Sequence, residues 1–316
     1  MPKISVVMPC YNHAQFVAES VKGVLNQSEQ DIELIIVDDC STDNSWYLIE
    51  GLANKDARVR PIKHPKNLGA SKSRNDGLRA ASGKFIGFCD ADDVWESDKL
   101  RVQIELLETS SGYGATYCDS IIIDGAGAQT GARYSELFPP PKKASGMLFN
   151  ELLGRNFINM QSVLMRRECL QDVGYFDEKI KWVEDWWYWI RVSRNHSFVY
   201  LPQVLGKYRV HSNSTNVMQR YGYSVNRFKV FHRILDEFDD LTEIVKAKII
   251  CHIGVELHSI GKHRFGHRFL WSCAQVAFKS RGASVQLGKS LFHLMVNPPR
   301  KSTFPYQPKI AALPVV

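Results

Sequence analysis

Residues 84–95 read KFIGFCDADDVW, an apolar run followed by the three carboxylates of Asp90, Asp92 and Asp93. The apolar part is typical of a strand that is buried on both faces of a parallel sheet. Neighbouring carboxylates repel one another unless a cation or hydrogen bonds compensate their charge. Two interpretations therefore compete. One is a polar turn that caps the next helix, and the other is a site for Mg²⁺ or Mn²⁺, which bind oxygen ligands.

Strand-like and helix-like segments alternate on both sides of this stretch. Apolar or β-branched runs predict strands at 4–8, 33–39, 59–64, 84–89 and 115–123. Helical spacing and capping residues predict helices at 14–28, 41–55, 69–82 and 97–110. This order predicts an α/β fold with a mostly parallel central sheet flanked by helices.

Ligands of open α/β sheets bind beyond the carboxyl ends of the strands, where this chain places its unusual residues. PCYNHA follows the first predicted strand, DDCSTDNS follows the second, and DADD follows the fourth. The three loops would meet at one edge of the sheet. That convergence favours the metal interpretation over the polar turn.

The remainder of the chain is less regular. Residues 124–145 are rich in Gly and Pro and read as a long loop, which is often a functional lid. Residues 146–212 mix helix and strand signals, and from about residue 220 the pattern is helical and basic. We therefore expect a helical C-terminal extension after the α/β part.

The composition, 44% hydrophobic and 23% charged over 316 residues, is typical of a soluble globular protein. No apolar run reaches the roughly 18–20 residues of a membrane-spanning helix. The start, MPKISVVMPCYN, has no signal-peptide layout, so we expect a cytoplasmic protein. The seven cysteines form no CxxC pair, which predicts a reducing compartment and no zinc site.

The net charge of +7 is concentrated near the C-terminus, where residues 206–316 hold 17 Lys and Arg against 6 Asp and Glu. An excess of basic residues indicates an anionic partner or simply a solvated helical surface. Within it, residues 262–280 interleave aromatic and apolar side chains with Lys and Arg, a pattern suited to an anionic membrane face. Packing as an ordinary helix is the competing interpretation.

Six motifs occur in order: SVVMPCYN, VDDCSTDNS, NLGASKSRNDGL, FCDADD, VEDWWYWIRV and YRVHSNS. Over about residues 3–215 the chain thereby resembles the glycosyltransferase family 2 enzymes, which have the GT-A fold. The resemblance implies an inverting transfer of a sugar from a nucleotide-diphosphate sugar to an acceptor hydroxyl, assisted by Mn²⁺ or Mg²⁺. It implies a catalytic domain at 1–215, with a nucleotide-sugar half at about 1–123 and an acceptor half at about 146–215. Residues 216–316 would form a basic helical region.

The resemblance assigns the metal site to the DxD motif, which matches Asp90-Ala91-Asp92. Asp92 would be the metal ligand, and Asp90 would contact the ribose or reach the metal through water. Ala91, between them, would border the donor. His211 matches a position that supplies a further metal ligand or contacts the diphosphate. Asp93 is either a helix cap or part of the site.

The donor would lie against three segments that match the family. In the first loop these are Pro9, Tyr11 and Asn12, with the Tyr11 ring stacked on the base. Asp39 would read the edge of the base, and Asn67, Gly69 and Arg74 would approach the nucleotide and its phosphates. Cys40 stands where the family usually has Gly, so the loop is expected to differ slightly there.

The ED pair of the family matches Glu184 and Asp185, and Asp185 would be the general base. Aromatic residues surround the pair, and an apolar setting raises the pKa of a carboxylate toward useful values. Trp182 and Trp187 are candidates for stacking on the acceptor, as are Gln161 and Ser162 for polar contacts to it. At helical spacing Trp182, Trp186 and Trp189 would share one side, which makes these three the candidates for the core.

The expected partners are a nucleotide-diphosphate sugar and a saccharide or lipid-linked saccharide of the cell envelope. Residues 216–316 would supply any peripheral contact with the inner face of the membrane. A non-catalytic nucleotide-sugar or glycan-binding protein with the same fold is the alternative. A nucleotidyltransferase is disfavoured because PCYNHAQF lacks glycines and charge. A dinucleotide oxidoreductase is disfavoured because no GxGxxG follows the first strand. We expect no nucleic-acid partner, because the basic region lacks any module signature.

Overall fold

The computed structural model describes residues 1–212 and 220–259, which form two compact units. The first unit comprises Met1–Leu152 and Asn156–Ser212, and the second contains Leu153–Arg155 and the described helices beyond residue 219. The domain boundary expected at 215 lies outside the described residues.

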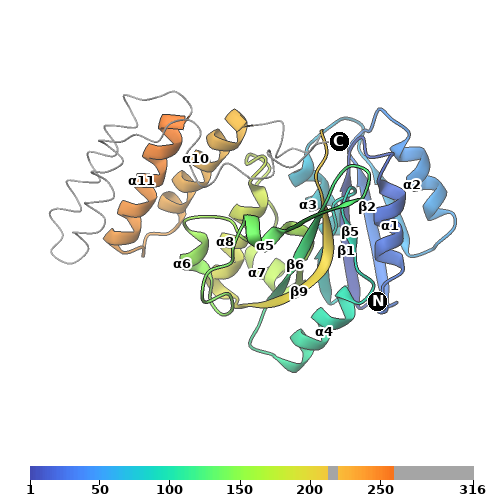
Figure 1. Cartoon of the computed structure of the whole chain (residues 1–316), viewed down its shortest axis with the longest axis horizontal. Helices are drawn as coiled ribbons and strands as arrows, with labels where there is room; N and C mark the ends of the chain where they lie inside the picture. The colour runs from blue at the N-terminus through green and yellow to red at the C-terminus, as the bar shows by residue number, and fades with distance from the viewer. Residues whose placement is uncertain (213–219, 260–316) are drawn as a thin grey trace. The chain divides into compact units, whose positions relative to one another are not determined.

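The first unit is built on one nine-stranded sheet with the order β3-β2-β1-β4-β8-β6-β9-β5, and β7 pairs with β6 (Figure 1). The strands are β1 (Ile4–Cys10), β2 (Ile32–Asp38), β3 (Val59–Lys63), β4 (Phe85–Phe88), β5 (Val94–Trp95), β6 (Ala115–Ile123), β7 (Gln129–Arg133), β8 (Val163–Arg166) and β9 (Phe198–Arg209). Strands β3, β2, β1 and β4 are parallel, and β9 is parallel to β6. Strands β8, β5 and β7 are antiparallel to their neighbours.

Helices lie between these strands and, beyond β9, in the second unit. They are α1 (Val17–Leu25), α2 (Ser45–Ala53), α3 (Ala70–Ala80), α4 (Lys99–Thr109), α5 (Tyr134–Leu137), α6 (Phe149–Leu152), α7 (Arg167–Val173), α8 (Glu184–Asn195), α10 (Arg220–Glu237) and α11 (Glu243–Ser259), with a 3₁₀ turn at Met160–Ser162. The predicted α/β fold, its five strands and its four helices are confirmed. The interpretation of 124–145 as a loop is wrong in part, because it contains β7 and α5.

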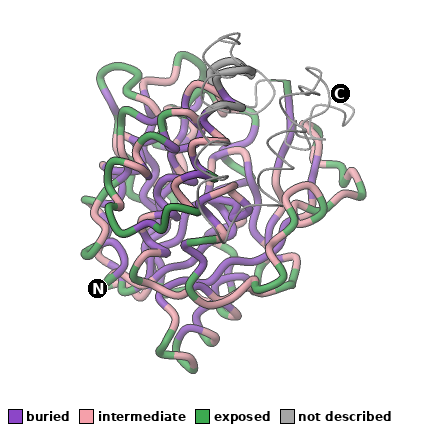
Figure 2. The backbone as a smooth tube through the Cα atoms, turned by 90° about the vertical axis from the view of Figure 1, so that its left-hand side faces the viewer, coloured by how far each residue is buried: buried purple, intermediate pink, exposed green. Residues whose placement is uncertain are grey.

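Helices cover both faces of the sheet, with α1 and α2 on one side and α7 and α8 on the other (Figure 1). Helices α1, α2 and α4 pack on alternate β1 residues such as Val6 and Met8. On the opposite face Val7 meets α3 so closely that a Cβ at Gly77 would lie 2.4 Å from its Cγ1. Strands β1, β2 and β4 are accordingly almost entirely buried, whereas β3 and β7 carry exposed residues. The exposed residues lie mainly at the periphery of the molecule (Figure 2).

The second unit is helical where the structure describes it. Helices α10 and α11 are joined by a buried ion pair between Arg227 Nε and Glu256 Oε1 at 2.7 Å. The rings of Phe231 and His252 stack at 5.0 Å between centroids. Among the described helices of both units, none has the length and apolar character needed to cross a membrane. The basic segment 262–280 lies outside the described residues.

Candidate functional site

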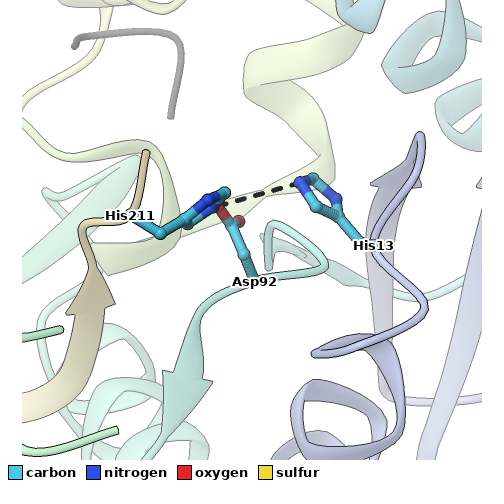
Figure 3. A group of neighbouring side chains, drawn as sticks. All are labelled: His13, Asp92 and His211. Carbon is cyan, nitrogen blue, oxygen red and sulfur yellow. Dashed lines mark hydrogen bonds and ion pairs between the residues drawn. The ribbon is translucent and has the colours of Figure 1, made fainter. Parts of the chain in front are cut away.

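Three side chains from separate segments meet at the carboxyl edge of the sheet (Figure 3). His13 follows β1, Asp92 follows β4 and His211 follows β9. Nε2 of His211 lies 3.1 Å from Oδ2 of Asp92, and Nε2 of His13 lies 4.0 Å from the same oxygen. The three ligand atoms all lie within 4.8 Å of one another.

The electrostatics of Asp92 favour its charged form. Burial raises its pKa, but the hydrogen bond with His211 and the charges of His13 and His211 lower the pKa below the ordinary value. A half-buried carboxylate flanked by two imidazoles is a donor set that divalent transition metals accept. The residues present therefore fit the divalent metal that the resemblance implies.

Arg209 and Asp93 hold this edge of the sheet together. Arg209 donates from Nε to the carbonyl of Asp92 at 2.7 Å and from Nη2 to Glu19 at 2.6 Å. Its backbone N–H donates to Oδ1 of Asp93 at 2.9 Å. The pKa of Asp93 is raised well above its usual range by burial and by the charges of Asp92 and Asp90. Asp93 is therefore not a helix cap, because it ties the turn after β4 to β9 and α4 begins only at Lys99.

Arg74, on α3, bridges the DxD turn and the start of α8. Its guanidinium donates from Nη2 to Oδ1 of Asp90 and from Nη1 to Oε1 of Glu184, both at 2.7 Å. The side chain is buried, and burial alone would lower its pKa. The charges of Asp90 and Glu184 nevertheless raise that pKa above the ordinary value. Because both terminal nitrogens donate to carboxylates, Arg74 is a bridge between the two motifs.

Asp185 lies in the first turn of α8 beside this bridge. Its Oδ1 accepts from the N–H of Trp186 at 2.7 Å, and its Oδ2 accepts from Nδ2 of Asn156 at 2.9 Å. Burial and the charge of Glu184 raise the pKa of Asp185 to about 7. A carboxylate with this pKa is suited to accept a proton near neutral pH.

The loops after β1 and β2 are fastened to each other and to α3. Oδ1 of Asn12 accepts from the N–H of Thr42 at 2.8 Å. Asp39 is buried and accepts from the N–H groups of Leu68 and Gly69 at 2.8 and 2.7 Å, and it pairs with Nδ1 of His64 at 2.7 Å. Asp39 thus holds the turn that starts α3, where Gly69 has φ 91°.

The surface beside Asp39 is open and partly apolar. The exposed fractions of Tyr11 and Leu68 are 42% and 37%. Asn67 is exposed and Pro9 is half-buried. An aromatic ring, a leucine and an amide are therefore exposed on the loops next to Asp39.

The family model described as glycosyl transferase family 2 matches residues 5–174, more than half of the chain. The chain belongs to glycosyl transferase family 2.

Curated relatives of this family 2 chain include the glucosyltransferase WfgD of Escherichia coli, whose name gives UDP-Glc and α-D-GlcNAc-diphosphoundecaprenol as substrates. It is 29% identical over 268 residues, 84% of this chain and 96% of WfgD. An uncharacterized glycosyltransferase of Rickettsia conorii is 30% identical over 235 residues, 74% of this chain but 37% of that protein. The chain thus spans about a third of the length of the Rickettsia relatives.

Solved structures share the fold. Staphylococcus aureus TarS 1–349 in complex with UDP-GlcNAc superposes with a TM-score of 0.65 at 18% identity, covering 98% of this chain and 90% of that TarS fragment. A mannosyltransferase from Pyrobaculum calidifontis, in complex with GDP-Man and Mn²⁺, has a TM-score of 0.62 at 16% identity and covers 98% and 86% of the two chains. The predicted GT-A fold is confirmed.

Several residues that the family resemblance assigns to substrate contacts are buried in the structure. Ala91 is fully buried, and its carbonyl accepts from Oγ of Ser20. Gln161 and Ser162 are buried against the sheet, and Trp187 is 1% exposed. The structure thus places all four residues in the interior, and their assignment to substrate contacts stays a prediction of the resemblance.

The aromatic residues before and within α8 divide differently from the helical prediction. Trp186 and Trp189 are buried, as expected for core residues. Trp182 precedes the helix, is half-buried and has φ 63°, so it does not share their side. A bulky residue in the left-handed region is strained, and such strain concentrates at functional sites. Trp182 remains a candidate for acceptor contact.

Two residues near the motifs were missed in the sequence. His13 is present in PCYNHA, but a single His after a strand is too common a feature to identify a metal ligand by its residue type. Asn156 precedes the 3₁₀ turn in an irregular stretch, and its contact with Asp185 depends on how that stretch crosses α8. The signal for His13 was its place in a loop at the carboxyl edge of the sheet.

Proposed function

We propose that the chain is an inverting glycosyltransferase that transfers a sugar from a nucleotide-diphosphate sugar to an acceptor hydroxyl. The observation that carries the proposal is the bridge through Arg74, which joins the DxD turn at Asp90 to the ED helix at Glu184. The first motif suits the diphosphate of the donor and the second suits the acceptor. A single buried guanidinium thus couples the two halves that a transfer reaction has to bring together.

Tyr11 and Leu68 would enclose the base of the donor, and the turn held by Asp39 would border it. Gly69 leaves space for close approach, since no atom lies within 4 Å of a Cβ built there. The half-buried carboxylate of Asp90 would lie near the ribose, with its orientation fixed by Arg74. The donor site therefore combines an aromatic face with backbone groups, which is typical of nucleotide recesses.

Asp185 would act as the general base. In the reaction the acceptor oxygen forms a bond to the anomeric carbon while the bond from that carbon to the diphosphate oxygen breaks. The hydroxyl proton passes to Asp185, and the bonding electrons leave with the nucleoside diphosphate. Attack opposite the leaving group inverts the anomeric configuration. The raised pKa of about 7 allows Asp185 to accept this proton at neutral pH.

Asp92 and His211 would hold the divalent metal. When bound, such an ion neutralises the charge that develops on the leaving diphosphate. Arg209 and Asp93 fix the backbone on both sides of these two residues, so their orientation does not depend on the substrate.

We propose a lipid-linked saccharide as the acceptor and cell-envelope polysaccharide synthesis as the context. The support is the similarity to WfgD, which is aligned over nearly its whole length and is named for a diphosphoundecaprenol acceptor. Trp182, at the edge of the ED helix, is the aromatic candidate for contact with the acceptor sugar.

The test measures nucleoside diphosphate release and product formation with UDP-glucose, UDP-N-acetylglucosamine and GDP-mannose, with a lipid-linked N-acetylglucosamine acceptor, in Mn²⁺ or EDTA. Asp185→Asn is the diagnostic variant, and Asp31→Asn, at an exposed position, is the matched control. We expect metal-dependent transfer with one donor, an inverted product, and a loss of about 10²- to 10⁴-fold in Asp185→Asn. Donor binding without transfer to any acceptor would favour a binding protein. No binding of any nucleotide sugar would refute both.

A further inference from the structure

We propose that His13 is a third ligand of the cation site, and that two imidazoles and one carboxylate make this site select Mn²⁺ over Mg²⁺. The inference rests on the proposed function, since it concerns the metal used by the same site. It adds a ligand from the β1 loop and a preference that the DxD motif alone does not imply.

The three ligand atoms all lie within 4.8 Å of one another, close to the separations that a single ion requires. Two ligands that each lie about 2.1 Å from a metal are separated by about 3 Å when adjacent and about 4.2 Å when opposite. Nε2 of His211 and Nε2 of His13 lie 3.1 and 4.0 Å from Oδ2 of Asp92. The side chains converge in Figure 3 with these atoms toward one another.

The backbone of His13 is fixed on several sides, so the ring position does not depend on a long flexible loop. Its N–H donates to Oγ of Ser45 at 2.9 Å, and its carbonyl accepts from the N–H groups of Phe16 and Val17. The preceding Asn12 has φ 55° and is bound to the β2 loop through Thr42. These contacts direct the imidazole toward Asp92.

The ring of His13 is not otherwise engaged by hydrogen bonds. Nδ1 is buried and has no hydrogen-bond partner among the residues that the structure describes. Nε2 is 4.0 Å from Asp92, longer than a hydrogen bond. Nε2 therefore faces the carboxylate of Asp92 without a hydrogen bond of its own, so its lone pair is available to a cation placed between the two side chains.

The donor set determines which ion is favoured. Mg²⁺ prefers oxygen ligands in octahedral geometry, whereas imidazole nitrogen suits transition metals such as Mn²⁺, Co²⁺ and Zn²⁺. Two imidazoles from His13 and His211 therefore shift the site away from Mg²⁺. An oxygen at position 13 would reduce that preference.

The experiment measures Mn²⁺ binding directly, by electron paramagnetic resonance titration of the full chain with and without UDP. Mg²⁺ competition gives the preference between the ions, and pulsed resonance detects ¹⁴N coupling from imidazole ligands. His13→Ala removes the ligand, and His13→Gln replaces its nitrogen with an oxygen or amide donor. His232→Ala, at an exposed histidine of α10, is the control.

We expect one Mn²⁺ per chain, displaced by half only when Mg²⁺ is in more than about tenfold excess. His13→Ala should weaken Mn²⁺ binding at least tenfold, because even outer-shell partners of a metal are worth about 10- to 100-fold. His13→Gln should narrow the preference for Mn²⁺ and reduce the ¹⁴N coupling, and His232→Ala should change neither.

Unchanged ¹⁴N coupling and unchanged Mn²⁺ affinity in a folded His13 variant would overturn the inference. Equal competition by Mg²⁺ in the unmodified chain would do the same. If His13→Ala does not fold, His13→Gln provides the same readout. If the His13 variants bound Mn²⁺ as tightly as the unmodified chain, and the chain still transferred sugar, the inference would be refuted and the proposed function would stand. The two failures are therefore distinguishable.

Discussion

Arg74 and Glu184 form a buried ion pair at 2.7 Å across 110 positions of the sequence. The other terminal nitrogen of Arg74 binds Asp90 at the same distance. One guanidinium therefore fixes the relative position of the two motifs that flank the reaction. Lysine cannot replace it, because a point charge lacks the planar fork that serves two carboxylates at once.

Replacing Arg74 by Lys should reduce kcat by about tenfold to 100-fold, because a misplacement of about 1 Å has such an effect. Replacing it by Met should destabilise the fold by about 3–5 kcal/mol, since Asp90 and Glu184 would then be left without their cation. Steady-state kinetics and chemical unfolding measure the two effects.

Arg79→Lys, on the same helix, is the control, because the Arg79 side chain is 45% exposed and pairs with Asp76 at the surface. It should leave kcat essentially unchanged and should change the free energy of unfolding by less than about 0.5 kcal/mol. If Arg74→Lys retained full kcat with unchanged donor KM, the bridge would have no part in positioning the motifs.

The pKa of about 7 for Asp185 predicts the pH profile of the reaction. A general base acts when deprotonated, so kcat should rise with pH, about tenfold per unit below pH 7, and level off above it. The profile is measured between pH 5 and 9 with saturating Mn²⁺ and donor. A rate that stays flat down to pH 5 would exclude Asp185 as the titrating base.

The same raised pKa has a consequence for stability. In the unfolded chain Asp185 ionises near its ordinary pKa of 3.8, whereas in the folded chain it resists ionisation until about pH 7. Stability is therefore fully present below the lower pKa and is lost as pH rises to the upper one. Relative to the unmodified chain, Asp185→Asn should gain stability progressively from pH 4 to 7.

The slope of this difference is the measured quantity, because Asn at position 185 also loses one of two accepted hydrogen bonds at every pH. Thermal unfolding of both chains at pH 5, 6, 7 and 8 provides it. A difference that does not change with pH would mean that the pKa of Asp185 in the folded chain is ordinary.

Asn156 should tune the base without contacting the substrate. Its amide donates to Oδ2 of Asp185 at 2.9 Å, and such a bond favours the charged carboxylate. Asn156→Ala should therefore move the acidic limb of the kcat profile to higher pH. A purely structural role would lower the rate at all pH values without moving the limb. Asn54→Ala, at an exposed position after α2, is the matched control.

The strands were predictable from the sequence because buried parallel strands produce long apolar runs. The carboxyl edge of the sheet, where the motifs lie, was predictable for the same reason. FIGFC and ELIIVDD each end in carboxylates, and parallel topology brings the ends of such strands together. The pairing of Arg74 was not predictable, because an Arg on a small-residue helix is equally typical of a surface charge. Its partner Glu184 reaches it only through the packing of α3 and α8 on one face of the sheet.

The burial of side chains in the acceptor half also could not be predicted from the sequence. NMQSV contains two polar residues, yet Gln161 and Ser162 are fully buried, because the 3₁₀ turn directs them into the sheet. Trp187 was ambiguous for a related reason, since a helix that is aromatic on most sides has no periodicity that identifies a solvent face. Metal assistance by His13 likewise needed the ends of β1 and β9 to be seen together.

Cys40 occupies a left-handed conformation with φ 62°, at the position where the family usually has Gly. The loop after β2 therefore keeps the conformation expected of Gly, and the sequence-based expectation of a local difference is not needed to accommodate Cys. The left-handed region costs a non-glycine residue roughly 1 kcal/mol, and Gly loses a similar amount through unfolded-chain entropy. Cys40→Gly should consequently leave stability within about 1 kcal/mol and leave UDP affinity unchanged, as measured by chemical unfolding and calorimetry.

Cys40→Val provides the contrasting variant, because a β-branched side chain tolerates positive φ least. It should destabilise the fold by about 1–3 kcal/mol and weaken UDP binding, since Ser41 and Thr42 in the same loop bind Asn12. Glu50→Val is the control for β-branching alone, because Glu50 is exposed, lies within helix α2 and has no positive φ. Equal stability of the Gly and Val variants would mean that the loop after β2 relaxes freely and that its left-handed residue is not under constraint.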